Sequence, residues 1–356
     1  MQAKHFPVVL YLLLVIGMGQ NPGTGPTALS PNQPNTQAAQ AQSQPTPAMG
    51  LASSHYQADF TPIEHHAVSW DKGHLVTFGP GEVKQPITLY DKTGKWLFDN
   101  PLTLEGATTT FVQDAVPTSE GTVAVAVAAI NADGAIADLI AEVGKDGVTR
   151  AIRTSPFRAS RLCTTAESRV WAYGWERNES GGDRHGHHPM LREYSFEKGQ
   201  LRSDVDRATV QPLKGIPVSG SIPYDLQLKC DSRKVILLSM PTHELMEYDL
   251  SSSKLIRWPI APLPEGFHLT GAALTDSGQV YVSALRGGPR PQALTGIFNL
   301  RASTGGTAEW VPLTIIPAED KWFMLVGSDG EDLVYSRGLR AATVFWSATG
   351  QKEAGK

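Results

Sequence analysis

A pattern about fifty residues long recurs along the chain and constrains its fold more than any other feature. Each copy opens with a polar turn, which a short apolar run follows. The first apolar residues of these runs are Leu75, Val123, Val170, Val235, Val280 and Leu333. Their spacings lie between 45 and 65 residues. A recurring period of this size is typical of folds built from one supersecondary unit that packs against its next copy.

Each copy also holds a second apolar run, and further apolar stretches lie before the first run and after the second. The second runs fall at 87–95, 138–147, 191–199, 245–254, 296–306 and 342–350. The runs are strand-like and end in turn residues. Charged residues make up only 19% of the chain, whereas 34 Gly and 25 Pro supply turns. The pattern therefore predicts an all-β protein with four strands in each unit.

Six such units at this period predict a six-bladed β-propeller of four-stranded antiparallel blades over residues 55–356. The last unit ends at Gly350 with only three strands, and residues 55–60 have no unit of their own. We expect this N-terminal strand to complete the sixth blade and close the ring. A seven-bladed ring is the alternative, because the gap of 65 residues before Val235 has room for a further blade. Two long loops, at 176–190 and 203–222, also account for that gap, so we prefer six blades.

This pattern resembles the six-bladed propellers of secreted bacterial proteins, in the broad TolB-like and NHL-like group. The resemblance covers residues 55–356 and implies the fold alone. Its motifs are a hydrophobic period and D-x-x-G or similar turns, which identify no particular family. Sialidase Asp-boxes and the paired G-H and W-D motifs of WD40 repeats are both missing from the sequence. No active-site residue is carried over from the group.

The first nineteen residues predict a signal peptide. Residues 8–19 are apolar and short for a membrane span, and Gly17 and Gly19 place small side chains before a cleavage point at Gln20. An uncleaved N-terminal anchor is the alternative. Residues 20–54 are rich in Pro, Gln and Ala and predict a disordered linker. Both interpretations place the rest of the chain in the periplasm or outside the cell, and cleavage of a signal peptide would leave no stable membrane span.

Polar residues at the predicted entrances of the innermost strands form the first candidate site. They are Glu64, His65, Arg158, Tyr224, Asp225, His268, Asp320 and Lys321. A propeller brings such loops together at one end of its central channel. Carboxylates and imidazoles gathered there can bind a metal or perform acid–base catalysis. Hydrated loop residues at a channel mouth are the simpler interpretation, and the one that the sequence favours.

Two further groups of side chains are candidate binding sites. His185, His187 and His188 lie in a Gly-rich loop, and histidine is a common ligand of transition metals. No rigid fourth ligand accompanies them, so a solvated loop is the favoured interpretation. Arg286 and Arg290 occupy positions in the fifth blade that match those of Arg337 and Arg340 in the sixth. Together they form a candidate anion site, but scattered surface charge is the favoured interpretation.

The chain has two cysteines, Cys163 and Cys230, on predicted inner strands of neighbouring blades. Outside the cytoplasm a disulfide between them would join the two blades. Their positions relative to Val170 and Val235 differ by two residues, which argues against the required geometry. The sequence leaves a disulfide and two reduced thiols equally open.

No nucleophile, phosphate-loop or zinc-protease motif is present in the sequence. The net charge of −4 also lacks the basic footprint of a nucleic-acid-binding protein. We therefore predict a monomeric, non-catalytic binding module for a protein, peptide or glycan. The alternative is a lactonase-, esterase- or lyase-like enzyme, whose cofactor would be a divalent metal in the central channel. A purely structural envelope protein is a third interpretation.

Overall fold

The computed structural model describes most of the repeat region. The described residues are 56–59, 67–79, 86–165, 169–176, 189–197, 200–201, 226–288, 293–303, 306–317, 323–337 and 343–348. They all belong to one compact unit, residues 46–356. The predicted signal peptide and linker lie outside the described residues, as does most of the sequence considered for a seventh blade.

The described strands pair into six four-stranded antiparallel sheets, and strands at equivalent positions recur in step. The innermost strands are β2 (Ala67–Asp71), β6 (Ala107–Pro117), β10 (Phe157–Thr164), β14 (Leu226–Cys230), β18 (Phe267–Leu274) and β22 (Phe323–Asp329). The second strands are β3 (His74–Phe78), β7 (Val123–Asn131), β11 (Arg169–Glu176), β15 (Lys234–Ser239), β19 (Val280–Arg286) and β23 (Asp332–Arg337). Each inner strand and its partner form a hairpin.

The two outer positions of each sheet follow the same order. The third strands are β4 (Ile87–Asp91), β8 (Ile136–Gly144), β12 (Pro189–Ser195), β16 (Glu244–Asp249), β20 (Leu294–Arg301) and β24 (Thr343–Ala348). The outermost strands are β5 (Trp96–Asn100), β9 (Gly147–Arg153), β13 (Gln200–Leu201), β17 (Lys254–Pro259), β21 (Glu309–Pro317) and β1 (Tyr56–Asp59). Within the described part of the chain, no helix is long and apolar enough to cross a membrane.

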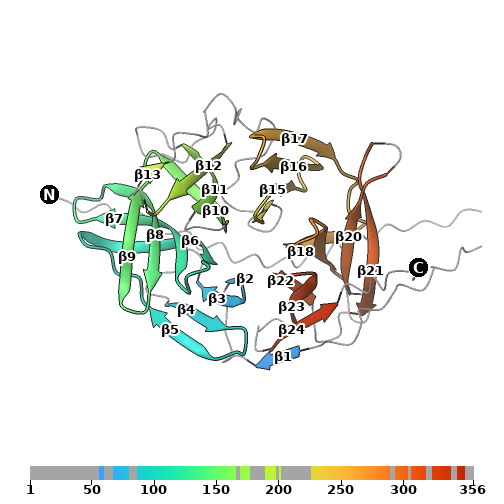
Figure 1. The fold of residues 1–356 in the computed structure, drawn as a ribbon, viewed down its shortest axis with the longest axis horizontal. Coiled ribbons are helices and arrows are strands. Elements are labelled where there is room, and N and C mark those ends of the chain that lie inside the picture. Colours follow the sequence, from blue (N-terminus) through green and yellow to red (C-terminus); the bar gives the residue numbers. More distant parts are fainter. Residues whose placement is uncertain are drawn as a thin grey trace, which may run out of the picture. The chain divides into compact units, whose positions relative to one another are not determined.

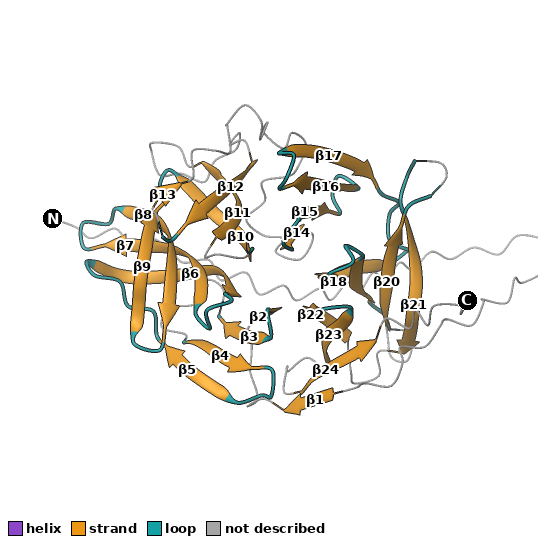
Figure 2. Ribbon diagram, in the orientation of Figure 1, coloured by secondary structure: helices purple, strands orange, loops and turns teal. Residues whose placement is uncertain are grey.

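The sheets stand around a central axis with their innermost strands towards it (Figure 1), and all of the drawn elements are strands and loops (Figure 2). This arrangement is a β-propeller, and the predicted all-β class is confirmed. The N-terminal strand β1 pairs with β24, with Tyr56 opposite Trp346, so it supplies the outer strand of the last sheet as predicted. Because this sheet combines strands from both ends of the repeat region, it has all four of its strands.

The core lies between neighbouring sheets rather than at the centre of the ring. One cluster joins Val76, Ile87 and Leu89 of the first sheet to Val125 and Val127 of the second. Because each sheet is covered on both faces, its middle strands are apolar at successive positions, and Val123–Ala129 of β7 is entirely buried. The continuous apolar runs of the sequence therefore follow from packing on both sides.

Four inner strands carry a β-bulge at matching positions. The pairing register shifts between Val112 and Asp114 in β6 and between Ala159 and Arg161 in β10. It shifts likewise between Leu269 and Gly271 in β18 and between Leu325 and Gly327 in β22. A bulge adds one unpaired residue and redirects the side chains next to it. In β6 and β10 the redirected residue is charged, which places Asp114 and Arg161 at equivalent points along the channel.

Candidate functional site

Most of the predicted site residues lie outside the described residues. From the channel-mouth group these are Glu64, His65, Tyr224, Asp225, Asp320 and Lys321. The histidines His185, His187 and His188 and the arginines Arg290 and Arg340 are also outside. Their predicted roles remain predictions.

Arg158 is on β10 itself rather than in the loop before it. Its Nη2 donates a hydrogen bond of 2.8 Å to Oε1 of Gln113, the extra residue of the bulge in β6. Its guanidinium carbon also lies 5.7 Å from the ring centre of Trp175. Arg158 thus holds two neighbouring inner strands together, which is a structural role.

His268 and Arg286 lie near one another in the fifth sheet but face different surroundings. His268 is exposed on β18, and its backbone pairs with Leu285. The guanidinium of Arg286 lies 5.6 Å from the ring centre of Phe267 in the same sheet. The register places Arg286 opposite Phe267 and Arg337 opposite Phe323, so the two arginines do occupy matching backbone positions.

Cys163 and Cys230 are joined by a disulfide that links β10 to β14, with 5.8 Å between their Cα atoms. The objection drawn from sequence spacing fails because the two hairpin turns differ in length. Thr164 pairs with Val170, whereas Cys230 pairs with Val235. The turn between β10 and β11 is one residue longer than the turn between β14 and β15, which accounts for one of the two residues by which the cysteine positions differ. The other residue corresponds to a displacement of one cysteine along its strand relative to the other.

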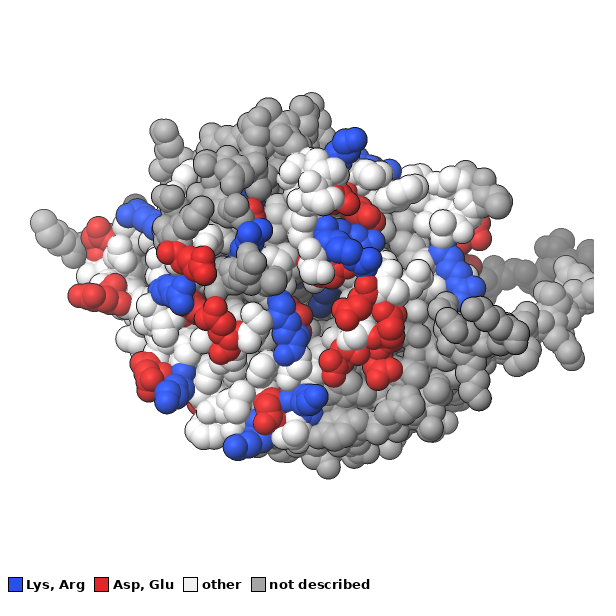
Figure 3. All heavy atoms as spheres, in the orientation of Figure 1, with Lys and Arg blue, Asp and Glu red and all other residues white. Residues whose placement is uncertain are grey.

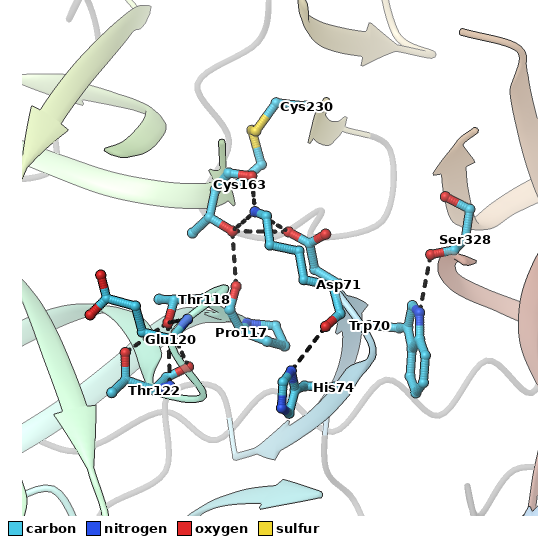
Figure 4. Close-up of polar contacts among 12 residues, drawn as sticks. Trp70, Asp71, His74, Pro117, Thr118, Glu120, Thr122, Cys163, Cys230 and Ser328 are labelled. Atoms are coloured by element: carbon cyan, nitrogen blue, oxygen red, sulfur yellow. Dashed lines mark hydrogen bonds and ion pairs between the residues drawn. A yellow bond between two sulfur atoms is a disulfide. The ribbon is translucent and has the colours of Figure 1, made fainter. Parts of the chain in front are cut away.

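A network of polar side chains joins the innermost strands at their hairpin end (Figure 4). Lys72, in the turn after β2, donates to the carbonyl of Thr164 and, over 2.7 Å, to its Oγ1. The Thr164 hydroxyl lies 2.9 Å from both Oδ2 of Asp71 and the carbonyl oxygen of Pro117. It has one proton, which it can donate to only one of them at a time. This network connects the first three sheets.

Asp114 and Lys229 extend the network along the channel. Oδ2 of Asp114 accepts a hydrogen bond of 2.7 Å from the backbone N–H of Leu162. Burial raises the pKa of Asp114 above its ordinary value, against the lowering effect of the Arg161 guanidinium. Burial also lowers the pKa of the Lys229 ammonium, against the raising effects of Asp71 and Asp114. Two carboxylates and several cations therefore compensate one another in a poorly hydrated place.

The other side of the ring is closed by hydrogen bonds to main-chain carbonyls. Nε1 of Trp70 donates to the carbonyl of Ser328 over 3.0 Å, and Oγ of Ser328 donates to the carbonyl of Leu274 over 2.6 Å. The cavity left between the inner strands at this level measures about 40 Å³. That volume holds roughly one water molecule. This cavity therefore offers little room for a ligand.

Sequence reasoning missed this network. Its members are Asp71, Lys72, Asp114, Thr164 and Lys229. The available signal was a charged residue inside an apolar inner strand, as in TFVQDAV for Asp114 and LQLKC for Lys229. A charge at such a position is buried between strands, and buried charges need partners. Within the described ranges, this network included, no three His, Cys, Asp or Glu side chains gather in a way that would hold a metal ion.

A hollow at the rim, between the first and second sheets, measures about 810 Å³. Its floor is one face of the second sheet: Ala129, Ala137, Leu139 and Ala151. One wall is the end of β5 and the loop that follows it, residues 99–105, and the other is the turn at 145–148. We call this hollow the rim groove. Pockets of this volume accommodate ligands of drug size or short peptides.

The face of the ring seen in Figure 3 mixes both signs of charge, with Asp and Glu gathered to the right of centre. On the hairpin turns of the fifth and sixth sheets, Glu331 accepts bonds from the backbone and hydroxyl of Ser277. Arg233 of the fourth sheet donates to the carbonyl of Asp276. The Glu331 carboxylate and the Asp276 backbone therefore take part in contacts between sheets.

No protein-family model and no characterised protein matches the sequence. Solved structures that share the fold do so at low identity. A luciferin-regenerating enzyme is 13% identical with a TM-score of 0.47, covering 82% of this chain and 92% of its own. A gluconolactonase from Xanthomonas campestris is 12% identical with a TM-score of 0.43, covering 84% and 87%. The N-terminal domain of Nup159 is 8% identical with a TM-score of 0.39, covering 82% and 76%. Because one fold hosts many functions, these likenesses carry no argument about activity.

Proposed function

We propose that this chain is an exported, six-bladed β-propeller that binds a protein, peptide or glycan without catalysing a reaction on it. The six four-stranded sheets support the number of blades. The rim groove is the observation that supports binding, because it combines a floor of small apolar side chains with a polar rim. Concave sites of this composition are the usual binding sites of proteins.

The channel network supports the same proposal, because its charged groups do not have the surroundings of catalytic groups. At the hairpin end, the Asp71 carboxylate and the Lys72 ammonium both contact Thr164 of another sheet. A catalytic group has to reach a substrate, whereas these groups are engaged with one another, and the cavity beside Asp71 measures only about 40 Å³. These groups stabilise the contacts between sheets, and we expect the ligand at the rim.

The test compares the full chain with a variant whose groove is filled. Ala151 is exposed on the groove floor, and Ala151→Trp places an indole there. Ala302→Trp is the control, because Ala302 is exposed in the turn after β20 and does not line the groove. All three proteins are applied to arrays of synthetic peptides and of glycans.

We expect a set of array signals that Ala302→Trp keeps and Ala151→Trp loses, because an indole occupies much of the groove. Signals that both variants keep would show that binding occurs elsewhere, and would contradict the proposal that the rim groove is the binding site. Turnover of esters or lactones on addition of Ca²⁺, Mn²⁺ or Zn²⁺ would contradict the non-catalytic role and favour the enzyme alternative.

A further inference from the structure

Apart from Ala129, which is buried, the floor of the rim groove is a less covered part of a sheet face whose remainder is packed. Val125 and Val127 of β7 and Ala141 of β8 pack in the cluster shared with the first sheet. Farther along the same face, Ala129 pairs with Ala137, and Ala151 pairs with Ala141. The first sheet has strands of five residues, whereas β6, β7 and β8 have nine to eleven. The longer face projects beyond its neighbour, and small side chains there leave space above it.

The rim of the groove is acidic. Asp99, Glu105 and Asp146 line it beside a single lysine, Lys145. All four are exposed, and the three carboxylates take part in no hydrogen bond or ion pair within the described residues. Acidic side chains gathered around an apolar floor favour a ligand with basic groups beside apolar ones.

The groove also lies beside two strand edges. Both β5 and β9 are outermost in their sheets, and both line the groove, β5 with Asp99 and Asn100 and β9 with Gly147, Val148 and Ala151. Outermost strands present backbone N–H and C=O groups that an added strand can pair with. An extended peptide uses such edges, whereas a glycan is usually held by stacking on an aromatic ring. No aromatic residue lines the described part of the groove.

We infer that the occupant of the rim groove is an extended peptide segment of a partner protein, with lysine or arginine on either side of apolar residues. This rests on the proposed function, since it names the partner class of the same groove. The apolar side chains lie over Ala137 and Ala151, and the basic ones reach the carboxylates of the rim.

The probe is a pair of synthetic octapeptide libraries with random apolar residues, in which two fixed positions hold lysine in one library and glutamate in the other. Binding to the full chain is measured by fluorescence polarisation at about 20 mM and about 300 mM salt, because salt screens exposed charge pairs. The rim variant carries Asp99→Asn, Glu105→Gln and Asp146→Asn. The control carries Glu197→Gln, Glu265→Gln and Glu309→Gln, which remove three exposed charges outside the groove.

We expect the lysine library to bind the wild type and the control about equally at low salt. The rim variant should bind it roughly tenfold more weakly, and high salt should reduce that difference. Equal binding by the rim variant, stronger binding of the glutamate library, or no binding of the lysine library would each overturn the inference.

Ala151→Trp distinguishes a failure of the peptide inference from a failure of the proposed function. If it abolishes capture of a glycan or an acidic peptide, the groove is a binding site and only the basic-peptide inference fails. If it changes no binding at all, the proposed function at this groove fails as well.

Discussion

The hairpin end of the central channel and the rim groove contain similar residue types, yet they use them in opposite ways. In the channel, Asp71 and Lys72 contact Thr164, and Asp114 accepts from the backbone of Leu162. At the groove, Asp99 and Glu105 are exposed beside an apolar floor. The channel charges connect sheets that are far apart in sequence. The rim charges connect nothing in the described residues and remain available to a partner.

This difference shows why charge at the centre of a propeller does not by itself mark an active site. The inner strands lie side by side around a narrow channel. A polar side chain there therefore contacts a neighbouring strand before it can contact a ligand. A binding site needs polar groups whose partners are missing from the folded chain. By that criterion the rim groove is the better candidate, and changes in the two regions should have different consequences.

The largest expected effect is the loss of the disulfide. Replacing Cys163 and Cys230 together by serine opens a loop whose ends lie 67 residues apart. The chain entropy released in the unfolded state predicts a loss of about 4 kcal/mol in the free energy of unfolding. Urea denaturation of the variant and of the reduced wild type should agree. A loss below about 1 kcal/mol would show that this end of the channel does not depend on the link.

The next effect compares added volume in the two regions. A Cβ at Gly271 of β18 would lie 2.1 Å from the carbonyl oxygen of Leu325 in the neighbouring inner strand. Gly271→Ala should therefore lower the free energy of unfolding by about 3 kcal/mol, because backbone has to move. Ala151→Trp, which adds far more volume in the groove, should change it by less than about 0.5 kcal/mol. Similar losses in both variants would remove the distinction between the regions.

The smallest effect concerns pH. Burial raises the pKa of Asp114 above 3.8, so the folded chain retains a proton that the unfolded chain has lost. Unfolding then releases a proton, and the free energy of unfolding falls as pH rises from about 3.8 to the folded pKa. Asp114→Asn does not titrate and keeps an acceptor for Leu162. The wild type should lose stability relative to this variant across that window, as measured by urea denaturation at successive pH values. A constant difference would contradict a desolvated carboxylate in the channel.

Sequence patterns predicted the strands well because each one has an apolar signature of its own. Val123–Ala129 reads as a buried strand, and the lone strand at 55–60 was assigned to the last blade, where β1 pairs with β24. The contacts between sheets were harder to predict. The sequence predicts Arg158 at a channel mouth, whereas its side chain donates to Gln113 of the neighbouring sheet. The sequence does not decide the disulfide, because a hydrophobic period does not reveal turn lengths.

The rim groove left no trace in the amino-acid sequence. Its floor residues Ala137 and Leu139 look like ordinary strand residues, and the space above them exists because the first sheet has shorter strands than the second. Its carboxylates look like any other loop charges.

The sequence by itself determined the all-β class, the repeating unit and the origin of the strand that completes the last sheet. These properties follow from local alternation of apolar and turn residues, which each segment carries independently. Only the tertiary structure decided which polar groups have partners. That outcome depends on distances between strands about fifty or more residues apart, and such distances are set by bulges, turn lengths and the packing of one sheet on the next.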